Sequence, residues 1–214
     1  MIERCNEINE KPKHEKSEKQ EKNWMSWDDV LNVYNDLKNN LKFSKNITEE
    51  QYNKLLEYVI LSLYIYIPPR RNQDYMICAF TKKKPTNKDI NYIDLKNGQI
   101  IFNVYKTSKK DGQLIININD DLDNVFKLYL RYHPLKKLLA VQDIPFLVNY
   151  DGKPLLNDNS ITRILNKIFK KNIGSSMLRH IYLSSKYKNV IKEQEKDSKL
   201  MSHNLLTQKD YIKI

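Results

Sequence analysis

Glycine and cysteine are both scarce in this chain of 214 residues, and their scarcity excludes several classes of protein. Four glycines are too few to suggest a nucleotide-binding fold built on glycine-rich loops. The two cysteines, Cys5 and Cys78, are too few for a disulfide framework and too far apart for a zinc-binding pair. We therefore expect a protein of a reducing, intracellular compartment without a structural metal site.

Long hydrophobic runs are missing as well. The longest apolar stretch, residues 58–67, is about half of the roughly 20 residues that a membrane span needs. The amino terminus contains no apolar signal segment. The sequence therefore predicts a soluble protein that is neither secreted nor bound to a membrane.

Positive charge is abundant and unevenly distributed. Lys and Arg number 37 against 26 Asp and Glu, a formal charge of +11. Residues 1–22 carry six basic and six acidic side chains, net zero, and have little to bury, so we expect a disordered tail. Residues 23–214 would then form one folded domain that carries the whole excess. A polyanion is the indicated partner, and a merely solvated lysine-rich surface is the alternative.

Two helices are expected near the start of the domain. Residues 24–42 place apolar side chains at three- and four-residue spacing. Thr48 and Gln51 form a capping box for a second helix that runs to about Ile67. Pro68 and Pro69 end that helix, because proline disfavours helical geometry in the preceding residue and has no N–H to donate. The following residues 70–74 are therefore presented at a corner.

The middle of the chain favours strands. Residues 92–95 and 99–105 are β-branched and aromatic runs separated by a turn at Asn97-Gly98, and residues 113–118 make a third strand. An extended piece is expected at 146–149. Gly174 is expected to cap the helix that we expect at 160–171. Further helices are expected at 122–132, 160–171, 177–187 and about 200–211. The predicted class is α+β: a mainly α-helical domain with a small three-stranded antiparallel β-meander at one edge.

Four short motifs follow one another along the domain. In chain order they are Arg71-Asn72-Gln73-Asp74, Tyr105-Lys106-Thr107, Ser176-Met177-Leu178-Arg179-His180, and Met201-Ser202-His203 leading to Tyr211. Their order and spacing resemble the catalytic domain of the tyrosine recombinase (phage integrase) family, in a divergent viral or mobile-element form. The resemblance covers residues 45–214.

This resemblance implies an enzyme that cleaves and rejoins double-stranded DNA through a covalent 3′-phosphotyrosine intermediate. It also implies a homo-oligomer, a tetramer, that assembles on DNA. The protein would act wherever in the cell its target DNA lies, and it would need no cofactor or metal. Such chemistry needs a nucleophile, cations that stabilise the developing negative charge, and an acid for the leaving 5′ oxygen. Only six of the 37 basic residues are arginines, yet three of the six are Arg70, Arg71 and Arg179.

The resemblance assigns a role to each cationic motif residue. Arg71 and Arg179 would clamp the phosphate, because a guanidinium contacts two oxygens at once. Asp74, three residues after Arg71, would hold that arginine, whereas Arg70 has Gln73 at the corresponding spacing. Lys106 would be the general acid, and solvated lysines at a strand tip are the alternative interpretation.

The remaining site residues come from the last two motifs. Tyr211 is the expected nucleophile, and His203 precedes it by eight residues. Ser176 occupies a position where the family usually has histidine, and a hydroxyl can donate a hydrogen bond there but cannot act as a base. Ser202 likewise stands where the family usually has glycine.

Three other functions remain open from the sequence. A catalytically inactive DNA-binding module is favoured by Ser176. A type IB topoisomerase or telomere resolvase would use the same set of residues for relaxation or hairpin formation. A basic scaffold protein would carry the motifs by coincidence.

Overall fold

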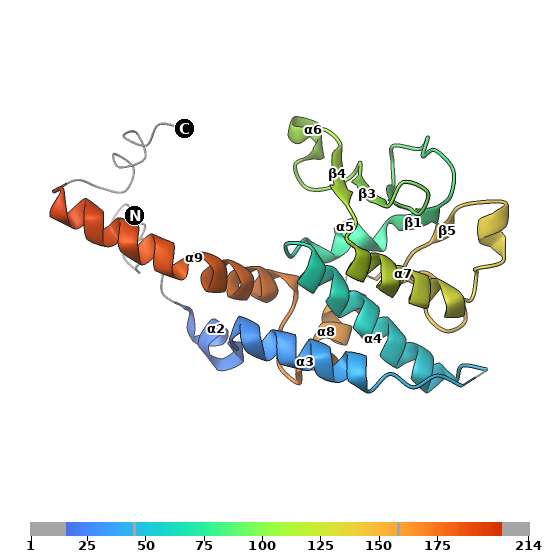
Figure 1. The fold of residues 1–214 in the computed structure, drawn as a ribbon, viewed down its shortest axis with the longest axis horizontal. Helices are drawn as coiled ribbons and strands as arrows, with labels where there is room; N and C mark the ends of the chain where they lie inside the picture. The colour runs from blue at the N-terminus through green and yellow to red at the C-terminus, as the bar shows by residue number, and fades with distance from the viewer. Residues whose placement is uncertain (1–15, 45, 158, 203–214) are drawn as a thin grey trace, which may run out of the picture.

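The computed structural model describes residues 16–44, 46–157 and 159–202 (Figure 1). The helices are α2 (Glu18–Asn23), α3 (Trp27–Asn39), α4 (Glu49–Tyr66), α5 (Asn72–Met76), α6 (Ser108–Asp111), α7 (Asp120–Tyr132), the 3-10 helix Leu138–Ala140, α8 (Ser160–Phe169) and α9 (Ser175–Leu200). The strands are β1 (Cys78–Thr81), β2 (Asn91–Asp94), β3 (Gln99–Phe102), β4 (Leu114–Asn117) and β5 (Ile144–Pro145). In this part of the chain no helix is both long and apolar enough to cross a membrane.

Helix α4 is the centre of the fold and packs against α3, α7 and α8. The expected capping box is confirmed, since the Thr48 side chain accepts from the Gln51 amide and the Gln51 side chain accepts from the Thr48 amide. The helix ends at Tyr66, before the two prolines, as expected. Most of its length is buried, because neighbouring helices cover it on several sides. The expectation of an amphipathic helix at residues 24–42 corresponds to α3.

The sheet is larger than the expected meander. Strands β2, β3 and β4 are antiparallel neighbours, near the ranges read from the sequence. The prediction of three strands is nevertheless wrong, because the sheet has five strands in the order β4-β3-β2-β1-β5. Strand β1 pairs parallel with β2 and antiparallel with β5, so the sheet is mixed. The domain is therefore a mixture of helices and one five-stranded mixed sheet.

The two faces of the sheet are buried against different partners. Ile93, Ile100 and Phe102 face the main core that surrounds α4. Tyr92 and Ile101, on the other face, pack with two neighbours in a small separate cluster. Strand β1 has four residues, and all four are buried, so its sequence shows no alternation of polar and apolar residues. This burial explains why the sequence did not reveal β1 as a strand.

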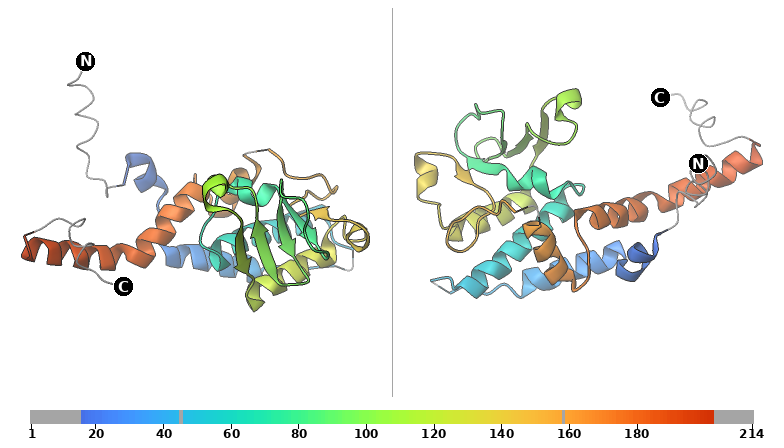
Figure 2. Two further views of the ribbon diagram at one scale, coloured as in Figure 1. Left: turned by 90° about the horizontal axis from the view of Figure 1, so that it is seen from above. Right: turned by 180° about the vertical axis from the view of Figure 1, so that it is seen from behind.

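The carboxy-terminal described segment is one continuous helix, and two expectations are wrong there. The helix expected at 177–187 continues to Leu200, and both views of Figure 2 show α9 running out from the body of the domain. Lys170, in a left-handed conformation with φ of 51°, caps α8, whereas Gly174 is the N-cap of α9. Most of the helix expected at 200–211 lies outside the described residues.

Order begins earlier in the chain than expected. The segment 1–22 was expected to be disordered, and for residues 18–22 this is wrong, because they lie in α2. Ser17 caps α2 with a capping box. Just beyond the helix, the Lys171 Nζ donates to the Trp24 carbonyl at 3.0 Å and the Asn172 amide donates to Asn23 Oδ1 at 2.9 Å. These contacts tie the beginning of the described chain to the turn before α9.

Candidate functional site

The corner after α4 places two arginines at the start of a short helix. Ile67 is extended, with φ of −127° and ψ of 139°, as a residue before proline should be. Arg71 is the N-cap of α5 and is also extended, so its side chain leaves the backbone outside the helix. Asp74 lies in the first turn of α5 and is buried. The sequence correctly placed this motif at a break between helices.

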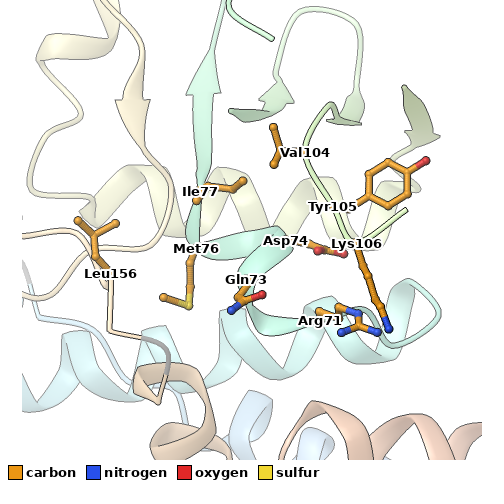
Figure 3. A pocket seen from close by; sticks show the side chains of 9 residues that line it. All are labelled: Arg71, Gln73, Asp74, Met76, Ile77, Val104, Tyr105, Lys106 and Leu156. Atoms are coloured by element: carbon orange, nitrogen blue, oxygen red, sulfur yellow. The ribbon is translucent and has the colours of Figure 1, made fainter. Parts of the chain in front are cut away.

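The partner of Asp74 is Arg70, and the expected pairing with Arg71 is wrong. The Arg70 Nη2 lies 2.9 Å from Asp74 Oδ2, and only 17% and 6% of the two side chains are exposed. The Arg70 guanidinium also lies 4.0 Å from the centre of the Phe102 ring and 5.2 Å from that of Tyr105. Arg70, four residues before Asp74, reaches its carboxylate across the first turn of α5, whereas the Arg71 side chain points toward Lys106 (Figure 3). Arg70 is therefore the enclosed arginine and Arg71 the available one.

Arg71 and Lys106 line the same pocket, which has a volume of about 560 Å³. Figure 3 shows their side chains pointing toward one another, Arg71 from the start of α5 and Lys106 from the segment after β3. Arg71 is half-buried and Lys106 is exposed. Two cations brought together in one hollow repel each other unless an anion lies between them. Asp74, which also lines the pocket, is already paired with Arg70, so the geometry is suited to binding an anionic group.

A buried asparagine joins the two sides of this pocket. Asn91 is fully buried, and its Nδ2 donates to the Asp74 carbonyl at 2.8 Å and to the Val104 carbonyl at 2.9 Å. Its Oδ1 accepts from the backbone amides of Asn103 and Val104, both at 2.8 Å. Through these four hydrogen bonds one side chain fixes the position of α5 relative to the segment that carries Lys106.

Arg179, the third cationic residue of the motifs, lies on α9. Its Nε donates to the Ser175 carbonyl at 3.3 Å, and the side chain is half-buried. Burial raises the pKa of Asp74, while the charges of Arg70, Arg71 and Arg179 act in the opposite direction. The charges of three of the six arginines in the sequence therefore act on one buried carboxylate.

Polar side chains in the interior link α5 to α4 and α8. Tyr64 donates to Asn72 Oδ1 at 2.6 Å, and Asn72 Nδ2 donates to Thr162 Oγ1 at 2.9 Å. Burial raises the pKa of Tyr64 well above its usual range, and the nearby charge of Arg179 opposes the shift. A Cβ placed on Gly174 would lie 3.5 Å from the Thr162 side chain. The network therefore joins α4, α5 and α8, and Gly174, the N-cap of α9, lies beside Thr162.

Ser176 lies exposed in the first turn of α9. Among the described residues no side chain caps this helix, whose N-cap is Gly174. Ser202 stands where the resembled family usually has glycine. Its φ is 55°, in the left-handed region that glycine adopts most easily. His203 and Tyr211 lie outside the described residues, so their assignments remain predictions.

Sequence reasoning missed the residues that organise the site. Asn72 and Asn91 act through burial and long-range hydrogen bonds, and neither stands in a sequence pattern that would indicate such a role. The sequence motif pairs Asp74 with the arginine three residues before it, which is Arg71. A spacing of four residues, as between Arg70 and Asp74, also permits an ion pair at the end of a helix.

Within residues 16–44, 46–157 and 159–202, no group of three or more His, Cys, Asp and Glu side chains could hold a metal ion. The chain matches no protein-family model, no curated protein and no solved structure in the comparisons made.

Proposed function

We propose that this chain is a site-specific DNA recombinase or integrase that cleaves and rejoins double-stranded DNA as a homo-oligomer. The observation that supports the proposal most directly is the shared pocket of Arg71 and Lys106, which the buried Asp74 also lines. Burial raises the pKa of that carboxyl, and the charge of Arg179 acts to lower it. These are the three cationic residues that the sequence motifs single out. They come from the start of α5, from the segment after β3 and from α9, and are up to 108 positions apart in the sequence.

The proposed reaction is a transesterification. The Tyr211 phenol oxygen bonds to phosphorus while the bond from phosphorus to the 5′ oxygen breaks, and the phenol proton passes to solvent. Lys106 gives a proton to the leaving 5′ oxygen, and the guanidinium groups of Arg71 and Arg179 bind the non-bridging oxygens. The reverse reaction, attack by a 5′ hydroxyl on the phosphotyrosine, rejoins the strand and frees the tyrosine.

A suicide substrate tests this proposal. Duplex DNA with a nick near the cleavage point loses the 5′ hydroxyl fragment, so that the covalent intermediate accumulates and survives denaturation. We expect an adduct with the parent protein, in the presence of EDTA as in its absence, because side-chain cations carry out the charge stabilisation. The target sequence is unknown, so a library of nicked duplexes serves as the substrate.

Matched tyrosine variants identify the nucleophile. Tyr211→Phe should bind DNA normally and form no adduct. Tyr187→Phe, at a tyrosine 42% exposed on α9, and Tyr182→Phe, at a tyrosine that packs edge-on against Trp27 with ring centres 5.2 Å apart, should form the adduct like the parent. An adduct that persists in Tyr211→Phe, or strict dependence on a divalent cation, would contradict the mechanism.

A catalytically inactive DNA-binding module is the second candidate. It is supported by Ser176, whose exposed hydroxyl cannot act as a base near neutral pH. Such a module would bind DNA with an affinity that falls with salt at a slope of about −0.9 per phosphate contacted, as the recombinase would. Only the adduct separates the two candidates: salt-dependent binding without an adduct on any nicked duplex would favour the inactive module.

A further inference from the structure

The pocket that holds Arg71 and Lys106 has a second half that is apolar. Its other lining residues include Met76, Ile77, Val104 and Leu156, and Figure 3 shows these side chains on the side of the pocket away from Arg71. We call these four side chains the aliphatic wall.

The aliphatic wall is partly open to water. Leu156 is 66% exposed and Val104 is 36% exposed, whereas Met76 is buried. A free phosphate or the backbone of a duplex would use the cations and leave this apolar surface uncovered. A ligand with both an anionic and an apolar part would cover both halves.

The dimensions and polar groups of the pocket narrow the choice of ligand. A volume of about 560 Å³ is within the range of small-molecule sites and exceeds what one phosphate group fills. The exposed Gln73 lines the pocket between the cations and the wall, and its amide has both donors and an acceptor. A planar base with polar edges suits this combination better than an acyl chain, because only the base can hydrogen-bond to the amide.

We propose that the pocket binds one nucleotide of the DNA, with its base taken out of the duplex stack. The phosphate lies between Arg71 and Lys106, the base rests against the aliphatic wall, and Gln73 donates to or accepts from the edge of the base. This inference rests on the proposed function, since it takes DNA as the ligand. Extruding a base costs more free energy in a paired duplex than at a nick or mismatch, so binding is favoured where pairing is already weak.

A pair of small ligands tests the inference without any cleavage. Thymidine 3′,5′-bisphosphate and the abasic 1,2-dideoxyribose 3′,5′-bisphosphate carry the same two phosphates and differ in the base. Titration of the full chain by calorimetry should show about tenfold tighter binding of the thymidine compound, which corresponds to burying roughly 55 Å² of apolar surface.

Variants of the wall provide the control. Leu156→Ser should reduce the affinity for the thymidine compound to that for the abasic compound and leave the abasic affinity unchanged. Val104→Ser should act in the same direction, so that the test survives if one variant fails to fold. Val141→Ser, at an aliphatic residue 68% exposed and outside the pocket lining, should behave like the parent.

The possible failures are distinguishable. Equal affinities of the parent for the two bisphosphates, or a thymidine preference that persists in both wall variants, would overturn the nucleotide pocket even if the covalent adduct forms. A tenfold preference that depends on Leu156 would support the pocket even if no adduct forms on any nicked duplex, in which case the recombinase proposal alone is wrong.

Discussion

Arg70 and Arg71 are adjacent in the chain, yet replacing them should have opposite consequences. Arg70→Met removes the ion-pair partner of Asp74, whose side chain is only 6% exposed. A buried carboxylate left without its partner typically costs about 3–5 kcal/mol of unfolding free energy, unless it takes up a proton. The lost contact of Arg70 with the Phe102 ring adds roughly 1 kcal/mol. Arg71→Met changes a half-buried residue at the pocket and should cost less than about 1 kcal/mol.

The assay is urea denaturation followed by circular dichroism, in parallel with the adduct assay. We expect Arg70→Met to lower stability by several kcal/mol, and Arg71→Met to leave stability nearly unchanged while abolishing the adduct. The double variant Arg70→Met, Asp74→Asn should regain about 1–3 kcal/mol over the sum of the single variants, because it leaves no unpaired charge. Equal losses of stability in the two single variants would refute the assignment of Asp74 to Arg70.

Three further predictions concern the site and the core. Arg71→Lys and Arg179→Lys keep the charge but lose the planar fork, so adduct formation should fall at least ~10²-fold with little change in DNA affinity, measured by gel assay and filter binding. Asn91→Asp removes both hydrogen bonds that its amide donates, so the adduct should fall about tenfold or more; an unchanged yield would mean that Asn91 does not position Lys106. Burial lowers the pKa of His133 to about 4, so below pH 6.5 the unfolded chain binds a proton that the folded chain does not. Stability should therefore fall by roughly 2–3 kcal/mol between pH 7.5 and 4.5, a loss absent from His133→Gln and retained in the exposed His180→Gln.

Local signals in the sequence were sufficient for much of the helical structure. Thr48 and Gln51 mark the start of α4 through contacts within four residues, and the prolines after Ile67 end it through covalent geometry alone. The Asn97-Gly98 turn is of the same kind, since Gly98 has φ of 62°. These features depend on neighbours in the chain and are therefore readable without the fold.

Long-range features could not be predicted in the same way. The parallel pairing of β1 with β2 depends on residues that are distant in the sequence. The helix α9 continues to Leu200 through a polar stretch that contains no clear stop signal. The site shows both cases. Arg71 and Lys106 were found from their motifs, whereas the role of Asn91 follows only from its four hydrogen bonds inside the fold.

The length of α9 limits where the end of the chain can act. From Arg179 to Leu200 the helix rises by up to about 32 Å, while the 11 residues from Leu200 to Tyr211 span at most roughly 36–40 Å when fully extended. For Tyr211 to reach the arginines of its own chain, these 11 residues would therefore have to span most of their maximum length. Delivery of the Tyr211 phenol to the arginines of a second copy on the same DNA is not limited in this way. In that arrangement, a mixture of Arg179→Lys and Tyr211→Phe proteins would form an adduct that neither forms alone, and the absence of such complementation would assign each tyrosine to its own protomer.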